Sequence, residues 1–289
     1  MSAAAEGADR ALVILAAGRA KRYGGVKPLA PVGPHGEAVI DLVASDALAA
    51  GFGTIVLVLS PSTGPAIRYH VEHTWPDAVD VHFATQPVPR GTVDAVLSAA
   101  AFVGEVPYGV CNADDIYGRD GCAQLVEHLR AHGDANALVG YRLADAVIGF
   151  SPVTRGICRV ADGGRLLGVD ERRKVSALVD GRFVSDDGRE PKELSPDARV
   201  SMNLWGFSPA FHKMLRSAMD AAVDASEEAE VLLPEVVAQS LDTCPFTVLP
   251  ATGRCIGVTH PDDLALVQAE LNRQVAAGER PAGLWTSLR

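Results

Sequence analysis

Four cationic side chains follow a short apolar run near the start of this 289-residue sequence. The run, residues 11–15, leads first into Ala16, Ala17 and Gly18 and then into Arg19, Lys21, Arg22 and Lys27. A strand that opens into a loop of small residues lets backbone N–H groups approach an anion closely. Cationic side chains on such a loop neutralise a polyphosphate, so the stretch predicts a nucleoside triphosphate site. A solvated basic loop is the alternative, and neither the Walker A motif nor the dinucleotide fingerprint is present.

Two adjacent carboxylates, Asp114 and Asp115, stand after a later apolar run in the segment CNADDIYG. Mg²⁺ takes oxygen ligands and keeps several of its waters, so carboxylates at the end of a strand suit that ion. The alternative is an Asx turn that ends the strand. Asp262 and Asp263, near the C-terminus, are further acids that either bind a metal or begin a helix.

An amide and a glycine follow another apolar run, in the segment QPVPRGTVDAV. The side chain of Gln86 both donates and accepts hydrogen bonds, so it can read the edge of a nucleobase. Gly91 lets a flat base lie against the backbone. The alternative is a proline-rich loop in which Thr92 caps a helix.

Charged and amide groups in the second half of the chain suit a sugar phosphate. In the segment DERRKV, Glu171 stands beside Arg172, and a carboxylate next to cations can grip sugar hydroxyls and a phosphate together. A solvated charged turn after a hairpin is the alternative. Asn203, inside the apolar segment VSMNLWGF, is either a satisfied core amide or a sugar contact.

The elements that must position these residues alternate between strands and helices. We expect strands at 11–16, 54–59, 79–84 and 107–111, and helices at 39–50, 65–74 and 92–103. Alternation of this kind implies a mostly parallel sheet with right-handed crossovers. Ligands on such sheets bind beyond the carboxyl ends of the strands, which places the basic loop, Gln86 and Asp114 at one edge.

The second half of the chain has a different pattern. We expect a hairpin over 156–169, a polar excursion over 176–199, a strand over 200–207, and helices at 208–219, 227–241 and 261–277. Ser208 and Pro209 form a good N-cap and first-turn pair. The predicted fold class is α/β, a Rossmann-like mixed, mostly parallel sheet flanked by helices, with a β-rich acceptor-binding lobe. We expect residues 1–10 to be a flexible tail and 11–289 a single domain.

Composition places the chain among ordinary globular proteins, with 48% apolar and 21% charged residues. A net charge of −10 argues against a nucleic-acid partner. No apolar run approaches the roughly 18 residues that span a bilayer, and the N-terminus lacks the pattern of a signal peptide. We therefore expect a cytoplasmic protein with no membrane partner. The five cysteines show no C-x-x-C pair, so we expect small core residues rather than disulfides or a zinc site.

The segment LAAGRAKRYGGVKPL resembles the signature loop of sugar-1-phosphate nucleotidylyltransferases, L-A-A-G-x-G-[TS]-R-x-x-x-x-K. Ala20 and Lys21 stand where that pattern has Gly and Ser or Thr. The resemblance implies that Arg22 and the loop amides hold the β- and γ-phosphates of an NTP. It also implies that Lys27 contacts the α-phosphate or the attacking phosphate, and that Asp114 binds the catalytic Mg²⁺. Asp115 is then expected to hydrogen-bond or orient a neighbour.

Later segments extend the resemblance from about residue 11 to 289. The matching positions imply nucleotide contacts at Ala16, Ala17, Gly18, Arg19, Gln86, Gly91 and Thr92, and acceptor contacts at Gly156, Glu171, Arg172 and Asn203. Many relatives place a second metal-binding Asp in W-x-D-x-G-T, where this chain has Gly257. We expect Asp263 to supply that carboxylate.

The reaction that the resemblance implies joins an NTP to a sugar-1-phosphate, with Mg²⁺ as cofactor, and gives an NDP-sugar and pyrophosphate. Three alternatives stay open. The first is the same chemistry on a cyclitol phosphate or a phosphoalcohol, and the second is a non-catalytic nucleotide-binding regulator. The third, a metal-dependent glycosyltransferase, would normally show a D-x-D motif. The nucleobase also stays open, and a homo-oligomer is compatible with the sequence.

Overall fold

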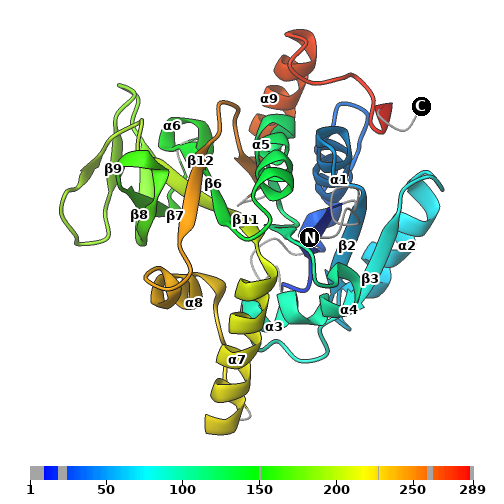
Figure 1. Ribbon diagram of the computed structural model, residues 1–289. Coiled ribbons are helices and arrows are strands. Elements are labelled where there is room, and N and C mark those ends of the chain that lie inside the picture. The colour runs from blue at the N-terminus through cyan, green and yellow to red at the C-terminus, as the bar shows by residue number, and fades with distance from the viewer. Residues whose placement is uncertain (1–9, 19–24, 150, 227, 259–262, 287–289) are drawn as a thin grey trace.

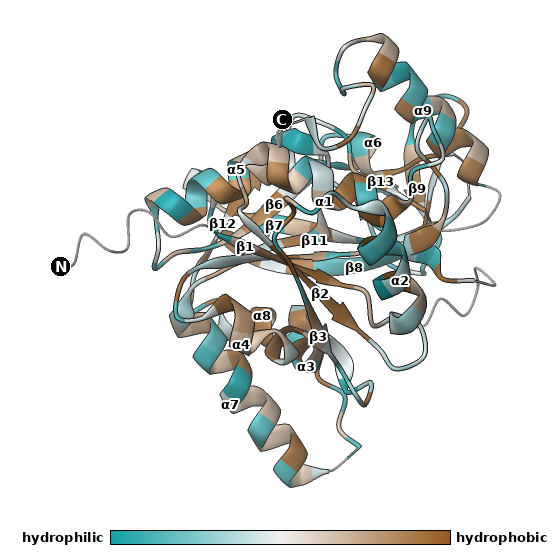
Figure 2. Ribbon diagram, turned by 90° about the vertical axis from the view of Figure 1, so that its right-hand side faces the viewer, coloured by the Kyte–Doolittle hydropathy of each residue, from teal (hydrophilic) through white to brown (hydrophobic). Residues whose placement is uncertain are grey.

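The computed structural model describes residues 10–18, 25–149, 151–226, 228–258 and 263–286 (Figure 1). Across that part of the chain, eleven strands form one mixed sheet, with parallel strands in one half and mostly antiparallel strands in the other. Helices cover both faces of the sheet (Figure 2). The α/β fold class predicted from the sequence is confirmed.

The parallel half contains β1 (Ala11–Leu15), β2 (Thr54–Leu59), β3 (Val81–Thr85) and β4 (Tyr108–Asn112), in the order β4–β1–β2–β3. All three pairings are parallel. Each strand lies close to its predicted range, because continuous apolar runs are typical of parallel strands that are covered on both faces. The carboxyl ends of these strands therefore share one edge of the sheet.

The three predicted helices of the first half follow these strands. α1 (Val39–Ala50) spans its predicted range and ends at Gly51, whose φ of 111° supplies the left-handed conformation favoured at a helix C-terminus. α2 (Gly64–Thr74) begins one residue early. The third predicted helix is divided into α3 (Gly91–Ser98) and α4 (Ala100–Val103). The predicted alternation of strands and helices thus matches the observed connectivity.

The other half of the sheet is built around β11 (Arg199–Phe207), which pairs with β4, β6 (Asn136–Arg142) and β7 (Val153–Val160), all antiparallel. β12 (Phe246–Pro250) adds a parallel strand beside β6, and β8 (Leu166–Ala177) forms the predicted hairpin with β7. β6 and β12 were not predicted from the sequence, and neither was the helix α5 (Gly118–Ala131). The β-rich region continues the same sheet, because β11 pairs directly with β4.

The remaining helices and strands complete the two layers. They are β5 (Asp115–Ile116), β9 (Phe183–Ser185), β10 (Glu193–Leu194), β13 (Ile256–Gly257), α5 (Gly118–Ala131), α6 (Leu143–Ala146), α7 (Pro209–Ala225), α8 (Leu233–Ser240), α9 (Leu264–Ala276) and the 3₁₀ turns Lys27–Leu29 and Asp162–Gly164. α7 begins at its predicted cap, where the Phe211 N–H donates to Ser208 Oγ at 3.2 Å. None of the helices in the described ranges is long and apolar enough to cross a membrane.

Two hydrophobic cores pack against the sheet, one on each face. Helices α1, α2, α5 and α9 bury side chains in the first core, and α3, α7 and α8 do so in the second (Figure 2). In the second core, the ring of Phe246 meets Trp205 and Phe211 nearly edge to face, with centroids 5.8 Å and 5.0 Å apart. Each such pair contributes about 0.5–1.5 kcal/mol beyond the burial of its area.

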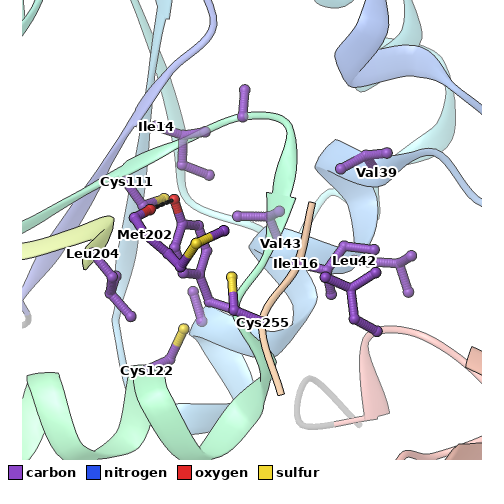
Figure 3. Close-up of a cluster of buried hydrophobic side chains, with 14 of the residues drawn as sticks. Ile14, Val39, Leu42, Val43, Cys111, Ile116, Cys122, Met202, Leu204 and Cys255 are labelled. Carbon is purple, nitrogen blue, oxygen red and sulfur yellow. Dashed lines mark hydrogen bonds between the residues drawn. The ribbon is translucent and has the colours of Figure 1, made fainter. Parts of the chain in front are cut away.

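The first core supports the end of β4 (Figure 3). Cys111, Cys122 and Cys255 are buried in it, and Met202 lies beside them. All five cysteines are free thiols, and four of them are buried. Cys111 immediately precedes Asn112, the last residue of β4. This core therefore fixes the end of β4, and with it the positions of Asp114 and Asp115, which follow.

Candidate active site

Among the pockets that the described residues form where the parallel strands end, two meet at Asp114. The larger pocket has a volume of about 560 Å³ and is lined by the loop after β1, the segment from β3 into α3, the end of β4 and part of the chain before α8. Its lining includes Ala17, Gly18, Gln86, Gly91, Thr92 and Asp114. These six residues are all predicted contacts of a nucleotide or its metal, and they come from three separate stretches of the sequence.

The smaller pocket has a volume of about 320 Å³ and shares Asn112 and Asp114 with the larger one. Three of the predicted acceptor contacts line it, namely Gly156, Glu171 and Asn203. They come from β7, β8 and β11, so the antiparallel half of the sheet builds this pocket. Asp114 therefore lies at the boundary between a pocket on the parallel half and a pocket on the antiparallel half.

Lys27 and Asp114 meet at this boundary. The Nζ of Lys27 lies 2.6 Å from Oδ2 of Asp114, and the two side chains are 18% and 35% exposed. A charge-assisted contact of this length is strong, yet both groups remain accessible to a ligand. The expectation that the cationic stretch meets Asp114 is confirmed for Lys27. Arg19 and Arg22 lie outside the described residues.

Ala16 is buried behind the loop rather than lining either pocket. Its side chain is 3% exposed, and its N–H donates to the carbonyl of Val58 at 2.9 Å. A ligand in the larger pocket therefore meets the loop at Ala17 and Gly18. All three small residues were predicted as nucleotide contacts, because the sequence does not show where hydrogen bonding to the neighbouring strand ends and the open loop begins.

The amide of Gln86 has a fixed orientation. Its Nε2 donates to the carbonyl oxygen of Gly91 at 3.0 Å and to Oδ2 of Asp94 at 2.9 Å, and the residue is only 6% exposed. Both partners accept only, so they require the nitrogen on their side. The carbonyl oxygen of Gln86 is then the atom left to accept from a ligand. Sequence reasoning did not single out Asp94 as the partner of this amide, although it stands one helical turn from Gly91.

Gly91 and Thr92 hold one wall of the larger pocket in place. Gly91 has φ of 91°, and an added Cβ would collide with the carbonyl oxygen of Val231. The Thr92 hydroxyl accepts from the Leu233 N–H at 2.8 Å, at the start of α8. Thr92 thus caps α8, whereas its side chain makes no cap bond to α3. Both residues shape the pocket through the segment that precedes α8.

Asn203 lies in the smaller pocket at an irregular point of β11. Its φ is 61°, and the pairing of β11 with β6 shifts register between Ser201 and Trp205. Asparagine tolerates this left-handed conformation better than most residues do. The Trp205 indole N–H donates to Asn203 Oδ1 at 3.3 Å, which leaves the amide nitrogen as a donor for a ligand.

Arg172 is not in either pocket, so its predicted role as an acceptor contact is corrected. Its guanidinium is buried, and it donates to Asp187 Oδ2 at 2.8 Å and to the carbonyls of Arg189 and Pro191 at 3.0 Å and 2.9 Å. Side chains alternate between the faces of a strand, so Glu171 faces the pocket and Arg172 faces away from it. Arg172 instead holds the excursion between β9 and β10, and its hydrogen bonds lower the pKa of Asp187.

Asp263 does not supply the second carboxylate either. It is buried at 5% exposure directly before α9, with Oδ1 near Gly149, and it lines neither pocket at Asp114. The prediction of Asp263 as a metal ligand is therefore not supported. Asp262 lies outside the described residues. Sequence reasoning favoured this acid because it follows Gly257 closely in the chain, but the start of α9 carries it away.

Asp115 and Arg155 are two further charged residues in the smaller pocket. Asn112 Nδ2 donates to Asp115 Oδ2 at 3.1 Å, while burial and the charge of Asp114 raise the pKa of Asp115 to about 6. The Arg155 guanidinium is held at its back by carbonyl oxygens, with Nε and Nη2 on Ala146 O at 2.9 Å and 2.8 Å. Arg155 therefore adds a second cation to the pocket besides Lys27. Sequence reasoning did not single out Arg155, although it stands next to Gly156, a predicted acceptor contact.

The donor set at Asp114 fits a magnesium ion. The described residues contain no group of three or more His, Cys, Asp or Glu side chains that could hold a metal alone. Mg²⁺ at phosphate-transfer sites needs fewer, because it is held by one or two carboxylates together with substrate phosphates and waters. Asp114 and Asp115 offer two carboxylates beside a cavity with room for such ligands.

Comparisons with known proteins identify the family and a similar fold. The chain belongs to the family of MobA-like NTP transferase domains, whose model matches residues 12–233. A crystal structure similar to this fold is that of a Bacillus anthracis protein provisionally named glucose-1-phosphate thymidylyltransferase, in complex with sucrose. The TM-score is 0.68 at 14% sequence identity, over 91% of this chain and 95% of that one. No curated protein is significantly similar in sequence.

Proposed function

We propose that the protein transfers a nucleotidyl group from an NTP to a phosphorylated sugar or sugar-like acceptor and releases pyrophosphate. The observation that carries this proposal is the pair of pockets with Asp114 in common and Lys27 against it. Two ligands bound there would meet at the one carboxylate that both pockets share. The provisional name of the structurally similar protein supports a sugar phosphate as acceptor.

The donor nucleotide would occupy the larger pocket. Ala17 and Gly18 offer a small-residue surface against which a triphosphate fits, and Arg22 on the same loop is proposed to contact its β- and γ-phosphates. The Gln86 oxygen would accept from an N–H of the base, with Asp94 fixing the amide. Both hydrogens of the amide are already used, so a base that needs a donor at this point is disfavoured.

The acceptor would occupy the smaller pocket. Glu171 and the amide nitrogen of Asn203 suit sugar hydroxyls, since one accepts and the other donates hydrogen bonds. Arg155 and Lys27 are the cations available to an acceptor phosphate. The pocket thus combines a carboxylate and an amide for hydroxyl groups with cations for a phosphate, which suits a phosphorylated polyol.

The reaction needs little covalent help from the protein. An oxygen of the acceptor phosphate, already ionised at neutral pH, attacks the α-phosphorus in line, and pyrophosphate leaves with the bonding electrons. Holding the two reactants in this geometry supplies up to roughly 7–11 kcal/mol of the barrier. Lys27 stabilises the charge that develops between the pockets. Mg²⁺ held by Asp114 would neutralise charge on the transferring phosphoryl group.

A matrix of NTPs against phosphorylated acceptors, with Mg²⁺ and pyrophosphate release as the readout, tests the proposal. Release with one nucleotide and a sugar phosphate is the expected result. Release only with a cyclitol phosphate or a phosphoalcohol would keep the chemistry and change the acceptor. Tight nucleotide binding without pyrophosphate release from any pair would instead identify a non-catalytic regulator.

A further inference from the structure

Two short strands bring Asp115 and Gly257 face to face. β5 and β13 pair in antiparallel register, with Asp115 opposite Gly257 and Ile116 opposite Ile256. Figure 3 shows Ile116 and Cys255, from these two neighbouring segments, among the side chains of the first core. The two positions are far apart in the sequence, so the pairing cannot be read from either segment alone.

The carboxylate of Asp115 occupies the space in which a side chain at position 257 would begin. A Cβ added to Gly257 would lie 2.5 Å from Asp115 Oδ1, whereas the next atoms, Asp115 Cγ and Met202 Cε, lie 3.8 Å away. Glycine at 257 is not required by a left-handed backbone, since its φ is not positive. The absence of a side chain at 257 therefore serves to leave room for the Asp115 carboxylate.

The orientation of this carboxylate is fixed from its other side. Asn112 holds Oδ2 at 3.1 Å, and Asn112 lines both pockets together with Asp114. Oδ1 is the oxygen that faces the space beside Gly257 that a Cβ would fill. Asp114 and Asp115 thus enter the smaller pocket from consecutive residues, with one carboxylate on Lys27 and the other between Asn112 and Gly257.

We propose that Asp115 is the second carboxylate that holds the divalent cation beside Asp114, and that Gly257 provides the space for it. The inference rests on the proposed function, because it concerns the cation of the same site. On this assignment, Asp115 on the facing strand supplies the carboxylate that the resembled family carries at the position of Gly257. Arg155, nearby in the pocket, would then face the acceptor phosphate and not the metal.

Binding of Mn²⁺ alone, followed by electron paramagnetic resonance of the free ion, tests the assignment. Asp115→Asn should weaken Mn²⁺ binding by roughly tenfold or more, since loss of supporting groups alone costs 10–100-fold in metal affinity. Asp263→Asn is the matched control, and it should bind Mn²⁺ as the wild type does. Equal affinity in Asp115→Asn and wild type would overturn the proposal.

Gly257→Ala separates ligation from simple charge, because it displaces the Asp115 carboxylate without removing it. It should weaken Mn²⁺ binding as Asp115→Asn does, and the exchange Asp115→Gly with Gly257→Asp should restore it. Wild-type affinity in folded Gly257→Ala would show that Asp115 acts only as a distant charge. Pyrophosphate release by the wild type is measured separately. If Mn²⁺ binds through Asp115 but no nucleotidyl transfer occurs, the proposed function is contradicted and this assignment is not.

Discussion

At the scale of single residues, the proposed site depends on a few polar contacts between side chains. Lys27 reaches Asp114, and Gln86 reaches Asp94. Lys27 and Asp114 are both apparent from the sequence as candidates, whereas Asp94, which fixes the Gln86 amide, is not. The residue scale therefore offers tests of the charge at the pocket boundary and of base recognition.

Lys27→Met should reduce kcat by roughly a thousandfold if Lys27 contributes about 4 kcal/mol to stabilising the transition state. The substitution keeps the length of the side chain and removes its charge from Asp114. Pyrophosphate release is the measurement, with thermal unfolding to verify the fold. Lys192→Met, at an exposed position, is the control. Turnover within a few-fold of wild type would exclude Lys27 from the chemistry.

Asp94→Ala should relax the choice of nucleobase. Loss of one acceptor frees the Gln86 amide to turn, so it can then donate as well as accept. One hydrogen bond contributes about 0.5–1.5 kcal/mol, so we expect the ratio of kcat/KM between preferred and other bases to fall roughly 2- to 12-fold. Asp77→Ala is the control, because Asp77 is exposed and lies outside the segment from Gln86 to Asp94. It should leave the kcat/KM ratio unchanged. An unaltered ratio in Asp94→Ala would show that Gln86 does not read the base.

At the scale of elements, two segments are held in place by residues that sequence reasoning assigned to ligands. Thr92 and Gly91 seat the segment before α8, and Arg172 seats the excursion between β9 and β10. Both are contacts between elements, although Gly91 and Thr92 also line the larger pocket. Their substitution should therefore affect stability or pocket shape before it affects chemistry.

Gly91→Ala should both destabilise the protein and weaken nucleotide binding. It combines a left-handed residue, worth about 1–2 kcal/mol of strain, with a collision against the backbone of Val231. Gly36→Ala is a matched control, because Gly36 has φ of 88° and open space around its Cβ position. Thermal unfolding and nucleotide titration of both variants give the comparison. Equal loss in the two variants would mean that the contact with Val231 carries no weight.

The Arg172–Asp187 ion pair should make stability depend on acid pH. The pKa of Asp187 is lowered in the folded state, mainly by the hydrogen bonds from Arg172, so its contribution is present above the unfolded pKa of about 4. The contribution is lost as the pH falls through the folded value. The stability difference between wild type and Asp187→Asn, from urea unfolding, should be constant above pH ~5 and shrink below pH ~4. A difference that grows on acidification would contradict this sign.

At the scale of the whole molecule, the continuous sheet brings the two pockets together. β4 pairs with β1 on one side and with β11 on the other, so it belongs to both halves. Asp114, which follows it, therefore lines both the larger and the smaller pocket. If the two halves were separate sheets, they would not share β4, and no common strand would bring Asp114 to both pockets.

The fold and the larger pocket were largely predictable from the sequence. Apolar runs, the cap at Ser208 and the glycine at 51 act over a few residues, so they placed most elements within a few positions. β6, β12 and α5 were not predicted, although Gly133 stands before β6 and Gly253 after β12. The parallel topology then put Ala17, Gln86 and Asp114 at one edge, as the general behaviour of such sheets requires.

What the sequence by itself determined was the type of chemistry, since the cations, carboxylates and amide were apparent as side chains on predicted strand ends. Which of them share a pocket was decided only by tertiary structure. Neighbours such as Glu171 and Arg172 separated because a strand turns successive side chains to opposite faces. Asp115 and Gly257 came together because an antiparallel pairing joined segments that no local pattern connects.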